Sequence, residues 1–176
     1  MNSTTSSALI DTVEEFLAHA MELELESVER YEQLADSMEV HNNLETASLF
    51  RKLAHFGQKH AHEVEQLASG MTLPKLPPWE FKWSTPESPE SVPMEEAHYL
   101  MDAYLALQLA LHNEQRGRDF YAKVADSSPN PEVREMALSF SEEEQEHIEL
   151  IKKWKENLRD PSNQPQEDLD PPNMPE

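Results

Sequence analysis

ELESVERY, at residues 24–31, recurs in altered form as EQRGRDFY at residues 114–121. Both copies place a glutamate seven residues before a tyrosine. Each copy is followed along the chain by a proline-free segment that carries a histidine on its apolar face. Internal similarity of this kind takes precedence over other patterns when a fold is inferred, because it indicates two related structural units. We therefore compare the two halves of the chain position by position.

The distribution of proline outlines the secondary structure. All 13 prolines fall into three groups, at residues 74–93, 129–131 and 161–175. Since proline breaks helix interiors, the segments without it are candidates for helices, and apolar residues recur in them at steps of three and four. The proline-free blocks are residues 7–39, 43–69, 94–126 and 132–159. The sequence therefore predicts an all-α protein with four long helices.

The lengths of the connections predict how the helices are arranged. Short links near residues 40–42 and 127–131 predict two antiparallel helical hairpins, and the segment at residues 70–93 is long enough to cross the bundle. We expect a four-helix bundle with one long crossover. The aromatic residues of the crossover are expected to pack on the side of the bundle; they are Trp79, Phe81 and Trp83.

A single folded domain is expected at residues 14–158, after an N-terminal extension at residues 1–13. The segment at residues 159–176 contains five prolines and five acidic residues, and this composition predicts a disordered tail. The N-terminus lacks a basic patch followed by an apolar core, so a cytoplasmic location is the default expectation.

Composition excludes several classes of function. Asp and Glu number 35 against 14 Lys and Arg, and the resulting net charge of -21 would repel nucleic acid and anionic membranes. The chain has no cysteine, which excludes disulfides and cysteine-ligated iron centres within it. Cations, basic partners and small uncharged oxidants are compatible with this composition.

A set of acidic and histidine side chains interrupts the apolar stripes of all four predicted helices. Glu24 and Glu114 lie among apolar residues, where an uncompensated carboxylate is costly. Glu144 and His147 are three residues apart and therefore share one helix face, and His60 lies on the stripe of the second block. Glutamates from two helices and Glu-x-x-His pairs from the other two form the sites of di-iron and di-manganese bundles. Mixed carboxylate and imidazole ligands suit iron or manganese better than structural zinc.

The second half completes its Glu-x-x-His pair, whereas the first half does not. Alignment of His60 with the histidine of the second half places Gly57 opposite Glu144, where a bridging carboxylate is expected. Water or an anion could fill this gap, Glu63 could reach it from one turn further along, or only one metal could bind well. Arg118, one turn after a candidate ligand, could turn toward the carboxylates or extend into solvent. We expect reduced or unequal metal occupancy.

Several other residues have two interpretations. Glu143 is the alternative to Glu144 as the inward-facing carboxylate of its helix. Tyr31 and Tyr121 could hydrogen-bond to ligand carboxylates, act as redox-active phenols, or be ordinary core tyrosines. The remaining histidines are expected at the surface; they are His19, His41, His55, His62, His98 and His112.

The two Glu-x6-Tyr motifs, Glu24 to Tyr31 and Glu114 to Tyr121, and the Glu144-Gln145-Glu146-His147 motif resemble the diiron-binding domain of the rubrerythrin family. The resemblance covers residues 14–158 and implies a ferritin-like four-helix bundle. It further implies a protein that uses one or two irons to reduce peroxide or to oxidise ferrous iron with dioxygen, and that often forms a homodimer.

The same resemblance implies Glu24 and Glu114 as terminal ligands, Glu144 as a bridge, and His60 and His147 as one imidazole for each metal position. The cysteine-rich rubredoxin-like domain of full-length rubrerythrins has no counterpart in this sequence. Electrons are therefore expected from a separate donor protein or from ferrous iron itself. Two other hypotheses are iron storage without turnover and a structural bundle with a degenerate site.

Overall fold

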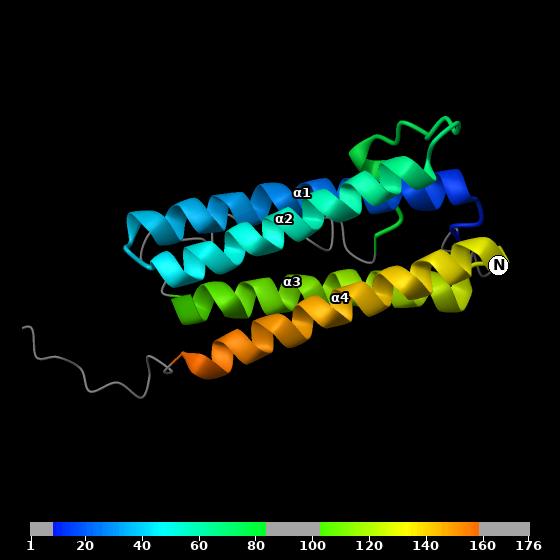
Figure 1. The fold of residues 1–176 in the computed structure, drawn as a ribbon. Helices are drawn as coiled ribbons and strands as arrows, with labels where there is room; N and C mark the ends of the chain where they lie inside the picture. Colours follow the sequence, from blue (N-terminus) through cyan, green and yellow to red (C-terminus); the bar gives the residue numbers. More distant parts are fainter. Residues whose placement is uncertain (1–8, 84–102, 159–176) are drawn as a thin grey trace, which may run out of the picture.

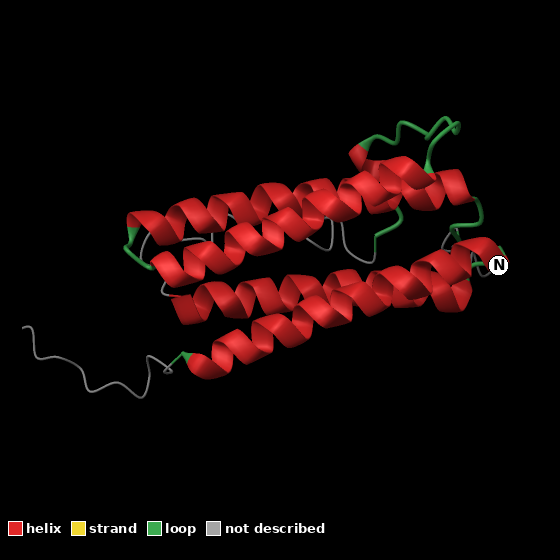
Figure 2. Cartoon of the chain, in the orientation of Figure 1, coloured by secondary structure: helices red, strands yellow, loops and turns green. Residues whose placement is uncertain are grey.

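The computed structural model describes residues 9–83 and 103–158. Within these residues the chain is all-α, and Figure 2 shows helices joined by loops without a strand. The predicted all-α, ferritin-like four-helix bundle is confirmed. The elements are α1 (Val13–Val40), α2 (Leu44–Leu67), the short 3-10 helix η1 (Pro78–Glu80), α3 (Ala103–Ser127) and α4 (Pro131–Asn157).

Local capping signals fix two of the helix starts. Thr12 Oγ1 accepts a hydrogen bond of 3.2 Å from the backbone N–H of Glu15, so α1 begins after Thr12, inside the proline-free block that starts at residue 7. Asn130 Oδ1 accepts a 3.0 Å hydrogen bond from the backbone N–H of Glu132, and Pro131 occupies the first turn of α4. The other helix ends lie within a few residues of the predicted blocks, apart from residues 94–102, which lie outside the described part of the chain.

The helices form two antiparallel hairpins that face each other. In Figure 1, α1 lies along α2 and α3 lies along α4, and the two pairs run side by side for the length of the bundle. This is the arrangement that the short and long connections predicted. The disordered tail predicted at residues 159–176, and the last part of the crossover, lie outside the described residues.

His19 corrects one sequence prediction, since we expected it at the surface and it is fully buried. Its Nε2 accepts a 2.9 Å hydrogen bond from the backbone N–H of Lys82, and its Nδ1 lies 2.8 Å from the carbonyl oxygen of Glu15. Burial lowers the pKa of His19, which favours the neutral ring that these two contacts require. The histidine therefore joins the crossover to α1.

Two aromatic residues of the crossover cover this contact. The rings of Phe81 and Trp83 lie 5.0 and 5.1 Å from the ring of His19, and Trp83 meets the ring of Phe120 edge-on at 4.9 Å. The prediction that the crossover aromatics pack on the side of the bundle is confirmed for Phe81 and Trp83. Among the other histidines, His55, His62 and His112 are exposed as expected and His41 is partly exposed; His98 lies outside the described residues.

The apolar core consists of two clusters at opposite ends of the bundle. The first cluster ends at Leu23 on α1 and begins at Phe120 on α3. The second cluster begins at Tyr31 on α1 and ends at Ala110 on α3. Between them lies a polar layer that draws on all four helices. In the described part of the chain, none of the helices is both long and apolar enough to cross a bilayer.

Candidate metal centre

The polar layer contains the five side chains that the sequence predicted as ligands. Each lies on the core-facing stripe of its helix, where the step of three and four residues places it at the same level of the bundle. The three carboxylates are almost fully buried, with Glu24 4%, Glu114 1% and Glu144 3% exposed. The predicted ligands are Glu24 on α1, His60 on α2, Glu114 on α3, and Glu144 and His147 on α4.

These side chains form two groups of donor atoms that share Glu144. Glu24, His60 and Glu144 can each offer one ligand atom, with all three atoms within 4.8 Å of one another. Glu114, Glu144 and His147 meet the same criterion. Oxygen and imidazole donors at these separations fit two cations of the iron or manganese type, with Glu144 between them.

Each half of the protein hydrogen-bonds to a carboxylate of the other half. The hydroxyl of Tyr31, on α1, donates a short hydrogen bond to Oε1 of Glu114, on α3. The hydroxyl of Tyr121, on α3, donates to Oε1 of Glu24, on α1, at 3.3 Å. Of the three roles considered for these tyrosines, the structure supports hydrogen bonding to ligand carboxylates. The bonds orient the carboxylates and connect the hairpins across the core.

Burial and mutual repulsion control the charge of the carboxylates. Burial, followed by the charge of Glu114 and a hydrogen bond with it, raises the pKa of Glu144 well above its ordinary value. Burial by itself would also raise the pKa of Glu114, but hydrogen bonds involving His147, Glu144 and Tyr31 outweigh burial and lower it. Without a cation, the raised pKa favours the neutral form of Glu144 more than in an exposed glutamate, whereas a bound metal ion would favour its ionised form.

Gly57 lies where α2 approaches α1 closely. A Cβ atom at this position would lie 2.8 Å from Cγ2 of Val28 and 3.6 Å from the carbonyl oxygen of Glu24. Because glycine has no side chain, it permits this approach, and the half of the layer that contains His60 has no carboxylate from this position of α2. The position where the sequence lacks a carboxylate is therefore also a position where α2 packs closely against α1.

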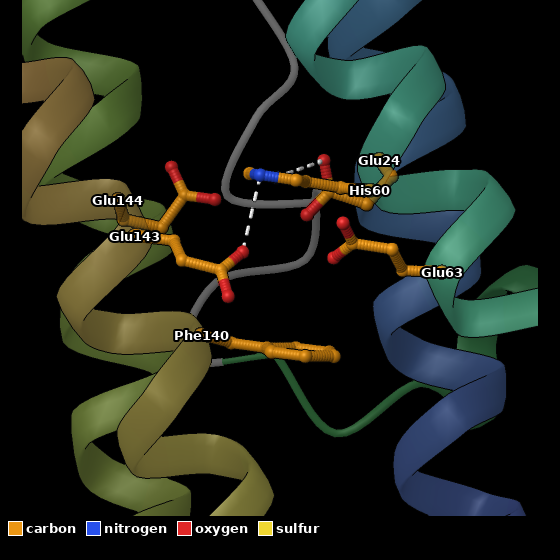
Figure 3. Close-up of a pocket in the computed structure, with 6 residues that line it drawn as sticks. All are labelled: Glu24, His60, Glu63, Phe140, Glu143 and Glu144. Carbon is orange, nitrogen blue, oxygen red and sulfur yellow. Dashed lines mark ion pairs between the residues drawn. The ribbon is translucent and has the colours of Figure 1, made fainter. Parts of the chain in front are cut away.

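A pocket opens beside this half of the polar layer (Figure 3). Its lining residues are Glu24, His60, Glu63, Phe140, Glu143 and Glu144. Glu143 Oε2 lies 3.1 Å from His60 Nε2. Glu143 and Glu144 thus both face the site, whereas only one of them was expected to face inward. Glu63 lines the pocket from α2 but is exposed.

Arg118 is directed away from the carboxylates. Its Nη1 donates a 2.8 Å hydrogen bond to Oε1 of Gln145, and its Nη2 lies 2.9 Å from Oδ1 of Asp119. The side chain is 30% exposed. Of the two orientations considered, the structure shows the outward one, so the guanidinium does not take the place of a metal ion.

Comparison with known proteins agrees with this architecture. A family model described as Rubrerythrin matches residues 15–100 and 106–172. The crystal structure of an uncharacterized conserved protein from Magnetospirillum magnetotacticum MS-1 is 44% identical to this chain. The match covers 87% of this chain and 99% of that one, with a TM-score of 0.72. No curated protein matches the chain significantly.

Proposed function

The chain belongs to the rubrerythrin family, and we propose that it binds two metal ions, iron or alternatively manganese, in the polar layer and reacts there with peroxide or dioxygen. Members of this family generally bind iron. The observation that carries the proposal is the shared position of Glu144, which contributes to both groups of donor atoms. A buried carboxylate within reach of two sets of ligands can bind two adjacent cations, as the inward-facing glutamates of di-iron and di-manganese bundles do.

The residues present divide into two sets of ligands. Glu24 and His60 would hold one ion, Glu114 and His147 the other, and Glu144 would bind both. Iron in such a site supplies redox chemistry, through a change in its own oxidation state. Glu144 must lose its proton before its oxygens can bind a cation, so we expect metal binding to release protons.

The surroundings of the ligands support the same function. Tyr31 and Tyr121 fix the orientation of Glu114 and Glu24. The two core clusters above and below the polar layer exclude water from it, which strengthens electrostatic interactions inside the site. The pocket lined by Phe140 and Glu63 lies against the half of the polar layer that contains His60. Electrons would come from a separate donor protein or from ferrous iron.

Two measurements test the proposal. The first is the metal content of the protein after aerobic purification, for which we expect iron or manganese bound to the chain and a marked loss in Glu144→Gln. The second is stopped-flow absorbance after anaerobic ferrous protein is mixed with peroxide or dioxygen. A rapid oxidation band is expected, and a protein that binds no metal would contradict the proposal at its first step.

A second candidate function is iron binding without turnover, and Gly57 favours it. The half that contains His60 lacks the carboxylate expected from α2, which reduces the negative charge available to a second dication. In this case the ferrous protein would bind metal but give no rapid absorbance change with peroxide. The same stopped-flow experiment therefore separates the two candidates.

A further inference from the structure

The two ring nitrogens of His60 face different carboxylates. Nδ1 lies 3.6 Å from Oε2 of Glu24, inside the polar layer. Nε2 lies 3.1 Å from Oε2 of Glu143, which belongs to neither group of donor atoms that could hold a metal. Figure 3 shows the imidazole between these two carboxylates. Nδ1 of His60 therefore faces a predicted ligand, Glu24, and Nε2 faces Glu143, which is not one of the predicted ligands.

His147, the counterpart of His60 in the second half, shows which nitrogen faces the metal position. Its Nδ1 lies 3.3 Å from Oε2 of Glu114 and 3.7 Å from Oε2 of Glu144. The two rings also lie nearly parallel, with centroids 5.2 Å apart and an interplanar angle of 15°. In both halves, Nδ1 is thus the nitrogen that faces the carboxylates of the predicted ligands. Nε2 of His60 instead faces Glu143.

Resting on the proposed function, we propose that Glu143 is the positioning residue of His60: its carboxylate accepts the Nε2 proton and so directs the Nδ1 lone pair at the metal position. A histidine ligand presents a lone pair on one nitrogen only when its proton is on the other, and a carboxylate partner fixes that tautomer. Such a partner also increases the basicity of the coordinating nitrogen.

Glu143 also supplies negative charge to the half of the site in which Gly57 replaces the expected carboxylate. Glu143 comes from α4 and reaches across to α2, so its carboxylate adds negative charge to the half that contains His60. Its side chain is 34% exposed, which leaves it partly shielded from solvent, whereas Glu63 is exposed. Glu143 is therefore better placed than Glu63 to strengthen this half of the site.

The test uses the full-length, metal-free chain titrated with Zn²⁺, a diamagnetic probe that is independent of turnover. Glu143→Ala removes the acceptor, and Glu143→Gln keeps an acceptor oxygen but removes the charge. Glu146→Ala is the matched control, because Glu146 is an exposed glutamate on the same helix. We expect Glu143→Ala to weaken one of two Zn²⁺ equivalents by about 10- to 100-fold, the usual effect of removing an outer partner of a histidine ligand.

Glu143→Gln is expected to recover part of this affinity, because it restores the acceptor without the charge, and Glu146→Ala to match the wild-type protein. Nitrogen-15 NMR of the histidine rings provides the second readout. In the zinc-loaded wild type, His60 should show a metal-bound Nδ1 and a slowly exchanging Nε2 proton. That proton signal should be lost in Glu143→Ala and kept in Glu143→Gln.

The possible failures are distinguishable. A wild-type chain that binds no Zn²⁺ would contradict the proposed function itself. A wild-type chain that binds two ions, with Glu143→Ala unchanged in affinity and in the Nε2 signal, would overturn only the role of Glu143. Glu143→Gln as weak as Glu143→Ala would also overturn the positioning role, because a hydrogen-bond acceptor would then not suffice.

Discussion

Gly57→Glu would add the carboxylate that one half of the site lacks, at a cost in packing. A Cβ atom at this position would lie 2.8 Å from Cγ2 of Val28, so one of the two helices must shift or Val28 must change its rotamer. Overpacking of this kind costs about 1–3 kcal/mol, and removal of a helix-interior glycine returns up to about 1 kcal/mol. We expect the metal-free variant to be less stable than the wild type, by up to about 3 kcal/mol.

A double-mutant cycle isolates the contact. Val28→Ala removes the methyl group that the new Cβ would meet, so Gly57→Glu should destabilise the Val28→Ala background much less than the wild type. The coupling should fall within about 0.5–3 kcal/mol, the range for residues in contact. Urea unfolding of the four metal-free proteins measures it. Additive effects would refute the view that close packing against Val28 accounts for the glycine.

Metal stoichiometry tests the chemical half of the prediction. Gly57→Glu should raise the occupancy of the metal position beside His60, which we expect to be the weaker of the two, since it adds an anionic ligand there. Gly57→Ala is the matched control, because it introduces the same Cβ without the carboxylate. Native mass spectrometry of the loaded proteins counts the ions, and an equal count in the two variants would show that the carboxylate at this position is not what limits occupancy.

Three other predictions concern the metal-free protein. The raised pKa of Glu144 lets the folded state hold a proton that the unfolded chain has released. The free energy of unfolding should therefore fall as the pH rises above about 4.5, by up to ~1.4 kcal/mol per pH unit. The raised pKa of His60 acts in the same direction above 6.5. Thermal unfolding at several pH values should show this slope, and Glu144→Gln should flatten it; an equally steep slope in the variant would contradict the assignment. Tyr31→Phe removes a buried hydrogen bond to Glu114 and should cost about 1.5–3 kcal/mol in urea unfolding. A loss below about 0.5 kcal/mol would count against that bond. His19→Ala should cost about 2–4 kcal/mol and expose the crossover to limited proteolysis, and unchanged proteolysis would contradict its role as a clamp.

The sequence predicted the helices well because proline and apolar periodicity act locally. Four helices, two hairpins and one crossover follow from where prolines lie and from the lengths of the links. The proline-free block begins at residue 7, and the start of α1 inside it is set by the Thr12 cap, which the positions of prolines do not report. His19 was misplaced because its burial depends on the crossover folding back over α1, a contact between distant segments that helix periodicity does not report.

The sequence also predicted which five polar side chains would lie in the core, since a polar residue on an apolar stripe needs compensation wherever it lies. The contacts between these side chains and their neighbours on other helices could not be predicted from the sequence. Tyr31 donates to the carboxylate of the other hairpin, not to the one on its own helix, and spacing within one helix carries no such information. Glu143 faces His60 because the rotation of α4 brings two adjacent glutamates to the site. The expected homodimer and electron donor stay predictions.

The most direct test of the central claim is anomalous scattering from crystals of the iron-loaded protein, recorded at the iron absorption edge. We expect two peaks in the polar layer on either side of Glu144, one bound by His60 and the other by His147. An iron-loaded crystal with no peak there, or with iron bound only outside the contact range of Glu144, would contradict it.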